Sequence, residues 1–333
     1  MELKERHSLK IVGVLLLSKS MAGKIRLCFS MFSTVYKNSL LIINTNLIHR
    51  STIQLLRFPF SYFLMPVFWF ALSFVDTINI PRTILVFIIL HLLVYPSSNG
   101  YNSYMDRDEG SIGGIENPLQ PTKQIFYVSI IMDLLAVALS FIISGTFAVC
   151  IIIYIVCSRL YSYREVRLKQ FPLIGYLTVV INQGSLTFFM VYHGAHENLS
   201  THVSWLPLIA AAFLIGGFYP ITQVYQHEAD ANDNVKTISM TLGKKGTFIF
   251  CAIMYAFAVS FLWLFYSNHE LYRQFIVLLI FFIPVIVYFT QWFLKVLKND
   301  NEANFKQTMR MNWLASTCTS LAFITIILIQ HFG

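Results

Sequence analysis

The sequence predicts an all-α membrane protein in which nine transmembrane helices form a bundle, built from two four-helix repeats plus one helix. Composition is the first of three observations that lead to this prediction. Of the 333 residues, 56% are hydrophobic and only 12% are charged, whereas soluble domains carry about 25% charged residues. The other two observations are the spacing of the apolar runs and the distribution of the basic residues.

Nine apolar runs follow one another along the chain, and most are close to the roughly 20 residues that cross a bilayer. They cover residues 58–75, 83–98, 125–143, 147–158, 171–191, 205–222, 247–266, 275–294 and 311–330. The fourth run is short, so we expect its helix to continue through Tyr161 and Tyr163, because the headgroup region tolerates tyrosine.

The basic residues indicate how these helices are oriented. If the N-terminus lies inside the cell, only Arg82 and Arg273 of the 24 lysines and arginines fall in outside loops. Lysine and arginine are enriched in the cytoplasmic loops of membrane proteins. We therefore expect the N-terminus and the loops at 99–124, 159–170 and 223–246 to be cytoplasmic, and the C-terminus to lie outside. The net charge of +8 then reflects topology, and neither a nucleic-acid partner nor a protein partner is expected.

Residues 1–50 are expected to form an N-terminal extension, loosely ordered or lying on the membrane surface, ahead of a transmembrane domain at 51–333. The apolar stretch 11–17 is short for the core of a signal peptide, and basic residues flank it on both sides. We therefore expect no cleaved signal, and we expect the extension to lie outside the helical bundle.

Two acidic clusters follow the second and the sixth apolar runs. The first reads NSYMDRDEGS at 102–111, and the second reads YQHEADANDNVKT at 225–237. Asp106 in the first cluster and Asp230 in the second are 124 residues apart, with four helices from one cluster to the next. This offset predicts a duplicated four-helix unit that places both clusters on the same side of the membrane.

Both clusters share one spacing: an amide residue, a carboxylate four residues later and another carboxylate three residues after that. The residues are Asn102, Asp106 and Glu109 in the first cluster, and Gln226, Asp230 and Asp233 in the second. Such spacing predicts a polar stripe on one face of a helix. Two oxygen-bearing stripes that face each other suit Mg²⁺, which prefers carboxylate and amide oxygens. The predicted metal ligands are Asn102, Asp106, Asp108, Gln226 and Asp230.

Basic side chains are expected close to this magnesium site. The loop between the fourth and fifth helices carries Arg164, Arg167 and Lys169, and Lys236 follows the second cluster directly. Carboxylates that hold a metal, surrounded by cationic side chains, are typical of a site for a polyphosphate. Arg167, Lys169 and Lys236 are therefore predicted to contact a diphosphate. The alternative is an ordinary set of cytoplasmic basic residues beside acidic helix ends.

The clusters and their surroundings resemble the UbiA superfamily of intramembrane prenyltransferases. The resemblance rests on Asn102-Ser-Tyr-Met-Asp106, on IENPL at 115–119 and on DNVKTISMTLGKKG at 233–246, and it covers roughly residues 52–330. It implies the nine-helix plan that the apolar runs predict independently.

The resemblance also implies a reaction. Members of the superfamily use Mg²⁺ and move an isoprenyl group from an isoprenyl diphosphate to a lipophilic acceptor, commonly an aromatic ring or a quinone precursor. By this resemblance the protein is a transferase of prenyl groups embedded in membrane lipid, with Asp106 and Asp230 as its catalytic residues.

The chain departs from the motifs of the superfamily at several positions. Ser103, Gly110 and Gln226 stand where the motifs carry Asp, and Asn234 stands where they carry Gly. Neighbouring carboxylates could restore the lost charge, namely Asp108, Glu109, Glu228 and Asp233. The departures leave open a terpene cyclase of the same fold, a non-catalytic lipid-binding protein or, as a different class, a transporter. Transporters place their coupling charges near the membrane midplane, unlike these clusters.

Three polar residues fall inside the apolar runs. Asp133 in the third run is a candidate for the base that removes a proton from the acceptor, or else a protonated carboxyl bonded to a neighbouring helix. His91 and Asn182 are expected to form hydrogen bonds between helices.

Overall fold

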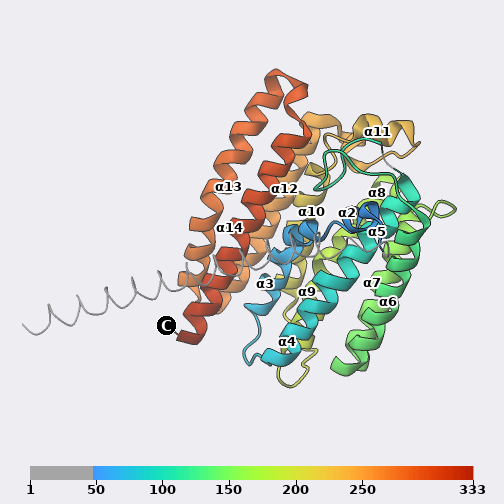
Figure 1. The fold of residues 1–333 in the computed structure, drawn as a ribbon. Helices are drawn as coiled ribbons and strands as arrows, with labels where there is room; N and C mark the ends of the chain where they lie inside the picture. Colours follow the sequence, from blue (N-terminus) through green and yellow to red (C-terminus); the bar gives the residue numbers. More distant parts are fainter. Residues whose placement is uncertain (1–47, 108, 333) are drawn as a thin grey trace, which may run out of the picture. The chain divides into compact units, whose positions relative to one another are not determined.

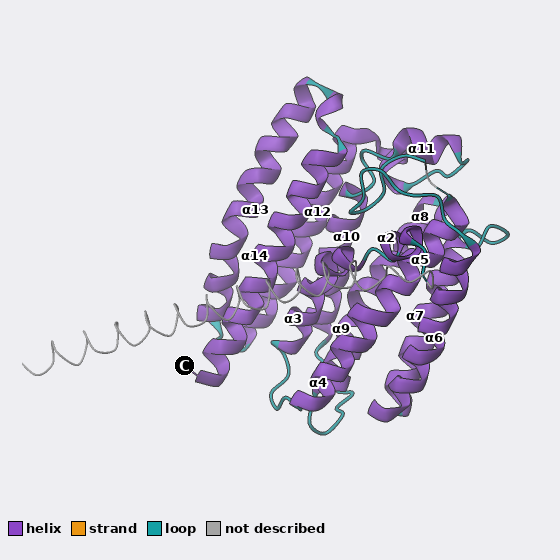
Figure 2. Ribbon diagram, in the orientation of Figure 1, coloured by secondary structure: helices purple, strands orange, loops and turns teal. Residues whose placement is uncertain are grey.

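The computed structural model describes residues 48–107 and 109–332. Within these ranges every regular element is a helix, and the chain from Arg50 onward forms one compact unit (Figure 2). The prediction of an all-α fold is therefore confirmed. Nearly all of the predicted N-terminal extension lies outside the described residues.

Eight helical segments among the described residues are long and apolar enough to cross a membrane: Arg50–Leu72, Ile80–Asp106, Lys123–Ile143, Gly145–Ser162, Pro172–Ala195, Ile238–Asn268, Tyr272–Lys298 and Phe305–Gln330. A ninth apolar helix, Trp205–Ile221, has 17 residues and is shorter than these eight. Each of the nine predicted runs thus coincides with an apolar helix, and eight of these have the length and composition of a membrane span.

Three of the spans combine different kinds of helix. The first consists of α2 (Arg50–Leu55), the 3₁₀ helix η1 (Phe58–Leu64) and α3 (Met65–Leu72). The second consists of α4 (Ile80–Phe87), the π-helix η2 (Ile88–Val94) and α5 (Tyr95–Asp106). The fifth consists of α8 (Pro172–Val179), the π-helix η4 (Val180–Leu186) and α9 (Thr187–Ala195). Such π-helical turns are rare and often occur at functional sites.

The other long helices contain no 3₁₀ or π-helical segment and run alongside one another in Figure 1. They are α6 (Lys123–Ile143), α7 (Gly145–Ser162), α10 (Trp205–Ile221), α12 (Ile238–Asn268), α13 (Tyr272–Lys298) and α14 (Phe305–Phe332). Short helices join them: η3 (Leu168–Gln170), α11 (His227–Asn232) and η5 (Asp300–Glu302). A bend interrupts α12 at Gly243, whose φ of 69° favours glycine.

Aromatic side chains form much of the core. The ring of Phe70 on α3 lies 4.8 Å from that of Phe188 on α9 and 4.5 Å from that of Phe323 on α14, measured between centroids. All three side chains are fully buried. Within a bilayer no water is displaced when helices associate, so packing contacts such as these stacked and edge-to-face rings hold the helices together.

The outer surface of several helices is apolar. On α6, Leu134 and Ile142 are 66% and 69% exposed, and Ile283 and Ile286 on α13 are also exposed. A soluble protein rarely exposes so many large apolar side chains, but the hydrocarbon region of a bilayer accommodates them. The helices therefore form the membrane-embedded part of an integral membrane protein.

The two ends of the bundle differ. At one end, the α11 end, side chains from the segments 109–111, 225–233 and 301–305 line a common open hollow. At the other end, the α4 end, the loops before α4 and after α9 pair through a hydrogen bond of 2.8 Å from Asn79 N to Ala195 O. The α11 end gathers most of the acidic and basic side chains that the sequence singles out.

Candidate active site

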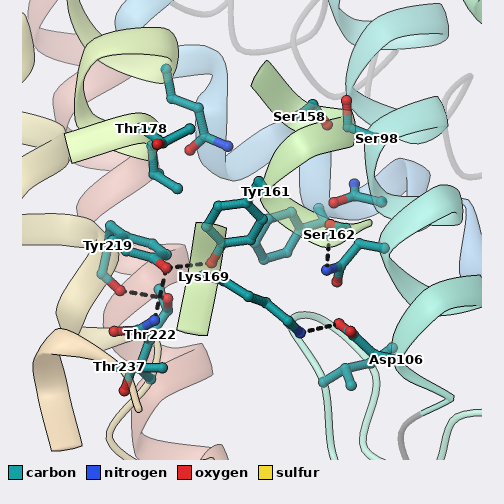
Figure 3. A pocket seen from close by; sticks show the side chains of 18 of the residues that line it. Ser98, Asp106, Ser158, Tyr161, Ser162, Lys169, Thr178, Tyr219, Thr222 and Thr237 are labelled. Atoms are coloured by element: carbon teal, nitrogen blue, oxygen red, sulfur yellow. Dashed lines mark hydrogen bonds and ion pairs between the residues drawn. The ribbon is translucent and has the colours of Figure 1, made fainter. Parts of the chain in front are cut away.

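The two acidic clusters line one cavity of about 200 Å³ near the α11 end of the bundle (Figure 3). Five of the predicted site residues contribute to its wall: Asn102, Asp106, Lys169, Gln226 and Asp230. Clusters that are far apart in the sequence are therefore neighbours in space, as predicted. The fifth predicted metal ligand, Asp108, lies outside the described residues.

The first cluster occupies the last turn of α5. Asn102 and Asp106 lie one turn apart, and α5 ends at Asp106 because Arg107 takes a left-handed conformation with φ of 55°. The backbone N–H of Arg107 donates to the carbonyl oxygen of Ser103 at 3.1 Å, which closes this turn. Glu109 follows the end of the helix and is exposed. The expectation that Glu109 continues the polar stripe is therefore wrong.

The second cluster lies on a separate short helix beyond α10. Gln226 precedes α11, and its carbonyl oxygen accepts a hydrogen bond of 2.8 Å from the backbone N–H of Asp230. The expected one-turn spacing is thus present, but on α11 rather than at the end of α10. Gln226 Nε2 donates to the carbonyl oxygen of Ser111 at 3.4 Å, so the second cluster contacts the loop that follows the first.

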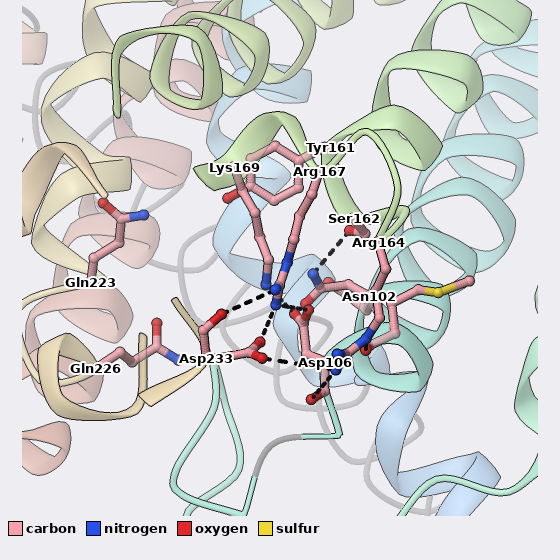
Figure 4. Close-up of polar contacts among 12 residues, drawn as sticks. Asn102, Asp106, Tyr161, Ser162, Arg164, Arg167, Lys169, Gln223, Gln226 and Asp233 are labelled. Carbon is pink, nitrogen blue, oxygen red and sulfur yellow. Dashed lines mark hydrogen bonds and ion pairs between the residues drawn. The ribbon is translucent and has the colours of Figure 1, made fainter. Parts of the chain in front are cut away.

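Asp106 is a buried acid of the cavity that pairs with two cations. Its side chain is only 4% exposed, and Lys169 Nζ lies 2.5 Å from Asp106 Oδ2 (Figure 4). Arg167 Nη2 lies 3.5 Å from Asp106 Oδ1. Two cations therefore balance one buried carboxylate, an arrangement that offsets the cost of removing the charge from water.

Arg167 connects the two clusters. Its guanidinium pairs with the carboxylate of Asp233 and donates to the carbonyl oxygen of that residue at 3.1 Å, while also facing Asp106. Arg167 precedes η3 in a left-handed conformation with φ of 44° and is buried. The backbone turn therefore directs this long side chain inward, between α5 and α11.

The remaining predicted cations are placed differently. Arg164 is exposed, and its Nε donates to the carbonyl oxygen of Met105 at 2.6 Å, at the end of α5. A cation is favourable at this end of a helix, where carbonyl groups lack partners. Lys236 is exposed and does not line the cavity. Of the three predicted diphosphate ligands, Lys169 lines the cavity, and Arg167 lies behind its wall, beside Asp106.

Several cavity residues were missed by reasoning from the sequence. Arg57 is buried, and its Nη2 donates to the carbonyl oxygen of Asn99 at 3.2 Å and to Asn102 Oδ1 at 3.4 Å. Asn102 Nδ2 donates in turn to Ser162 Oγ at 3.0 Å. The sequence feature that could have identified Arg57 is its position directly before Phe-Pro, at the start of the first predicted helix.

Two tyrosines form another part of the wall. The hydroxyl groups of Tyr161 on α7 and Tyr219 on α10 lie 2.5 Å apart. Figure 3 shows the Tyr161 ring in the middle of the view and Tyr219 across from Asp106. The sequence offered only the expectation that Tyr161 lies near the headgroup region.

Asp133 does not line the cavity. Arg159 Nε on α7 donates to Asp133 Oδ2 at 3.0 Å, Arg159 Nη2 pairs with the same oxygen, and Ser97 Oγ on α5 donates to Asp133 Oδ1. The carboxylate is thus paired with a cation, as a membrane-embedded charge requires. Of the two alternatives for Asp133, this contact favours the bond to a neighbouring helix over the role as a base, although the carboxylate is paired with a cation.

The donor set of the cavity suits Mg²⁺. Asp106 and Asp230 supply carboxylate oxygens, and Asn102 and Gln226 supply amide oxygens, all of which are hard ligands. Within the described ranges, no group of three or more His, Cys, Asp or Glu side chains is arranged to hold a metal. Mg²⁺ commonly binds one or two carboxylates together with phosphate oxygens and water, so a pair of acids fits this ion.

The sequence of this helical region matches a known protein family. The model of the UbiA prenyltransferase family matches residues 63–315. The chain belongs to this family. Membership in the UbiA family implies an enzyme that transfers prenyl groups, and it confirms the resemblance seen in the sequence motifs. No curated protein sequence matches the chain significantly.

Solved structures of UbiA proteins share the fold. A UbiA homolog from Archaeoglobus fulgidus bound to DMAPP and Mg²⁺ has a TM-score of 0.62 at 16% identity, covering 84% of this chain and 99% of that chain. A digeranylgeranylglyceryl phosphate synthase has a TM-score of 0.55 at 18% identity, covering 84% and 98%. The UbiA homolog from Aeropyrum pernix K1 has a TM-score of 0.59 at 15% identity, covering 82% and 98%.

Proposed function

We propose that this UbiA-family protein is a Mg²⁺-dependent prenyltransferase that moves an isoprenyl group from an isoprenyl diphosphate to a lipophilic acceptor, such as an aromatic ring or a quinone precursor. The observation that carries the proposal is the meeting of Asp106, Asp230 and Lys169 around one cavity, with Arg167 beside Asp106. The A. fulgidus homolog, with the same fold, has been solved with DMAPP and with GPP, each with Mg²⁺.

Asp106 and Asp230, with the amide oxygens of Asn102 and Gln226, would hold the metal. Bound Mg²⁺ would neutralise the negative charge that grows on the departing diphosphate. The C–O bond of the allylic diphosphate breaks and its electron pair leaves with the diphosphate. The acceptor then forms a bond to the allylic carbon and loses a proton, so that the reaction is balanced.

Lys169 and Arg167 are suited to receive the diphosphate. Both cations already lie beside the buried carboxylate of Asp106, at 2.5 Å and 3.5 Å. A metal on Asp106 would weaken these ion pairs and leave the ammonium and guanidinium groups to donate to phosphate oxygens. Because the donors are held in place before the reaction, they stabilise the developing charge with little reorganisation.

The finer topology is part of the proposal. We infer that Trp205–Ile221 is the ninth span and that the helices form two four-helix repeats plus α14, with the α11 end in the cytoplasm. Arg57 and Arg167 support the repeat. Each precedes a 3₁₀ helix in a left-handed conformation, and each contacts the polar cluster of its own half, at Asn102 and at Asp233.

The direct test is turnover by the purified protein in lipid nanodiscs. Labelled isoprenyl diphosphates of increasing chain length are incubated with Mg²⁺ and a panel of lipophilic aromatic acceptors, with EDTA as the control. An alkylated acceptor that forms only with Mg²⁺ supports the proposal. A cyclic hydrocarbon in its place would instead identify a terpene cyclase, and the absence of any consumed diphosphate would rule out both enzymes.

A further inference from the structure

The wall of the cavity away from Asp106 is unexpectedly polar. It is formed by Thr178, Asn182, Gln183, Tyr219 and Gln223, of which Thr178 and Tyr219 are seen across the cavity from Asp106 in Figure 3. An isoprenyl chain offers no hydrogen bond to such a wall. The side chains must therefore be satisfied by one another or by a different ligand.

Two of these side chains keep an unused acceptor. Asn182 Oδ1 and Gln223 Oε1 are buried and have no hydrogen-bond partner among the described residues. Asn182 is 8% exposed and Gln223 is 5% exposed, although both line the cavity. A buried carbonyl oxygen without a donor is destabilising, so a ligand that brings donors to this wall gains affinity.

A hydrogen bond to a carbonyl orients the Asn182 amide, and the Gln223 amide is bonded to a tyrosine hydroxyl. Asn182 Nδ2 donates to the carbonyl oxygen of Thr178 at 2.7 Å, and a carbonyl can only accept. The amide of Asn182 therefore cannot be reversed without losing this bond. Gln223 Nε2 donates to the hydroxyl of Tyr219 at 2.8 Å, and that hydroxyl is already bonded to Tyr161.

The backbone that carries Asn182 packs closely against α10. Asn182 lies on η4, and Gln223 follows the end of α10, the helix against which η4 packs. A Cβ atom on Gly184 would lie 2.7 Å from Ala212 Cα, so only glycine allows η4 to approach α10 this closely. The π-helical turn thus presents Asn182 at a fixed place in the cavity wall.

We propose that Asn182 and Gln223 form the subsite that selects the acceptor, by accepting hydrogen bonds from its hydroxyl or amino groups. The inference rests on the proposed prenyltransferase function and names the chemistry of its second substrate. Both amides act on binding and orientation, which makes them specificity-determining residues. The sequence predicted that Asn182 forms a hydrogen bond to another helix. In the structure its side-chain amide instead donates within its own span.

The test compares acceptors that differ only in their donors. Dihydroxynaphthalene and its dimethyl ether are used with the wild-type protein and with Asn182→Leu and Gln223→Met, which keep side-chain size but remove the amide. Thr178→Val is the matched control, because the Thr178 hydroxyl lines the same cavity but donates within its own helix at 2.7 Å. Direct binding is measured as well as turnover, so the comparison does not depend on which acceptor reacts.

We expect each amide variant to weaken binding of the dihydroxy compound by about 10-fold or more, and to leave binding of the dimethyl ether within about 2-fold. Thr178→Val should change neither. If the wild-type protein binds both compounds equally, or if the variants weaken both alike, the subsite assignment is wrong. Should Asn182→Leu fail to fold, Gln223→Met alone decides the outcome.

A separate measurement distinguishes failure of the subsite from failure of the proposed function. Binding of an isoprenyl thiodiphosphate with Mg²⁺ is followed by calorimetry in all four proteins. Equal binding with altered acceptor preference supports the subsite. Absence of Mg²⁺-dependent binding in the wild-type protein would contradict the prenyltransferase proposal, whatever the naphthalene compounds show.

Discussion

At the scale of single residues, Asp106 combines a structural and a chemical role. Its carboxylate is buried next to Lys169 and Arg167, so it neutralises two cations in the absence of substrate. Asp230 is less buried and also lines the cavity. The two acids therefore differ in what their loss would do to the folded protein, although both are expected to hold the metal.

Replacing either acid by asparagine should lower Mg²⁺-dependent turnover by about 100-fold or more, because a neutral amide cannot balance the charge of the ion. Asp106→Asn should also lower stability, since it leaves Lys169 and Arg167 with less compensation. Turnover and thermal unfolding are measured for both variants. Glu109→Gln is the control, because Glu109 is exposed. Near-normal turnover in both Asn variants would refute the metal-site assignment.

Helical periodicity explains how much of the site was predictable. Residues four apart share a helix face, so Asn102 with Asp106 and Gln226 with Asp230 could be paired from the sequence alone. Arg167 was predicted at the site from its loop, but the pairing of Arg57 with Asn102 and of Arg167 with Asp233 could not be predicted, because both arginines adopt left-handed turns that no spacing reveals. The end of α5 at Asp106 was likewise unpredictable, and it removes Glu109 from the expected stripe.

At the scale of helices, the pair of Asp133 and Arg159 joins three elements near the cavity. Asp133 belongs to α6, Arg159 to α7, and Ser97 on α5 bonds to both. The guanidinium of Arg159 also lies 4.2 Å from the ring centroid of Tyr101. Ser158, which precedes Arg159, lines the cavity. The ion pair thus fixes α5 and α7, which carry Asn102 and Ser162, relative to each other.

Removing one charge of this ion pair should destabilise the protein more than removing both charges. Asp133→Asn leaves Arg159 without compensation among apolar helices, and we expect a loss of about 3 kcal/mol in the free energy of unfolding. The double variant Asp133→Leu with Arg159→Leu should lose less than either single change. Unfolding in detergent is the measurement. A double variant less stable than both singles would show that the charges themselves are not what matters.

The docking of α11 should depend on pH. His227 Nε2 lies 2.7 Å from Ser239 Oγ at the start of α12, and burial, together with the nearby Lys244, lowers the pKa of His227 below its ordinary value of 6.5. Below about pH 6.5 the undocked histidine binds a proton more readily than the docked one, so acid favours undocking. Docking is therefore strongest above this pH and weakens as the pH falls.

Hydrogen exchange of residues 226–237 measures this effect. Corrected for the intrinsic rate, exchange should be faster at pH 5.5 than at pH 7.5 in the wild-type protein. In His227→Gln, which can still bond to Ser239 but does not titrate, the difference should be much smaller. An equal difference in both proteins would show that another group controls the docking of α11.

At the scale of the whole molecule, the apolar runs predicted the helices well, because a bilayer demands long continuous stretches of low polarity. They did not predict the 3₁₀ and π-helical turns at η1, η2 and η4. At η4, for example, Gly184 lies close to the backbone of α10, and hydropathy does not reveal such a contact. Helical periodicity identified the residues of each acidic cluster, and the fold brings the two clusters to one cavity.

The open hollow at the α11 end constrains the topology. Glu109, before α6, and Asn301, before α14, both line this hollow, so they must lie on the same side of the membrane. If Trp205–Ile221 did not cross, five membrane crossings would separate these two residues. The five would be α6, α7, the span from α8 to α9, α12 and α13. An odd number would put the two residues on opposite sides. We therefore expect Trp205–Ile221 to cross as well, despite its 17 residues.

Single-cysteine labelling tests this topology in a variant whose five native cysteines are replaced by alanine. Glu109→Cys and Asn301→Cys report on the α11 end, and Asn268→Cys reports on the turn after α12; all three positions are exposed. In sealed vesicles of known orientation, an impermeant maleimide should label the first two only from the cytoplasmic side and the third only from the opposite side. Labelling of Glu109→Cys and Asn268→Cys from one side would refute the nine-span arrangement. Labelling of the α11 end only from outside would preserve the nine spans and overturn the orientation, since an inverted protein keeps every contact within the bundle.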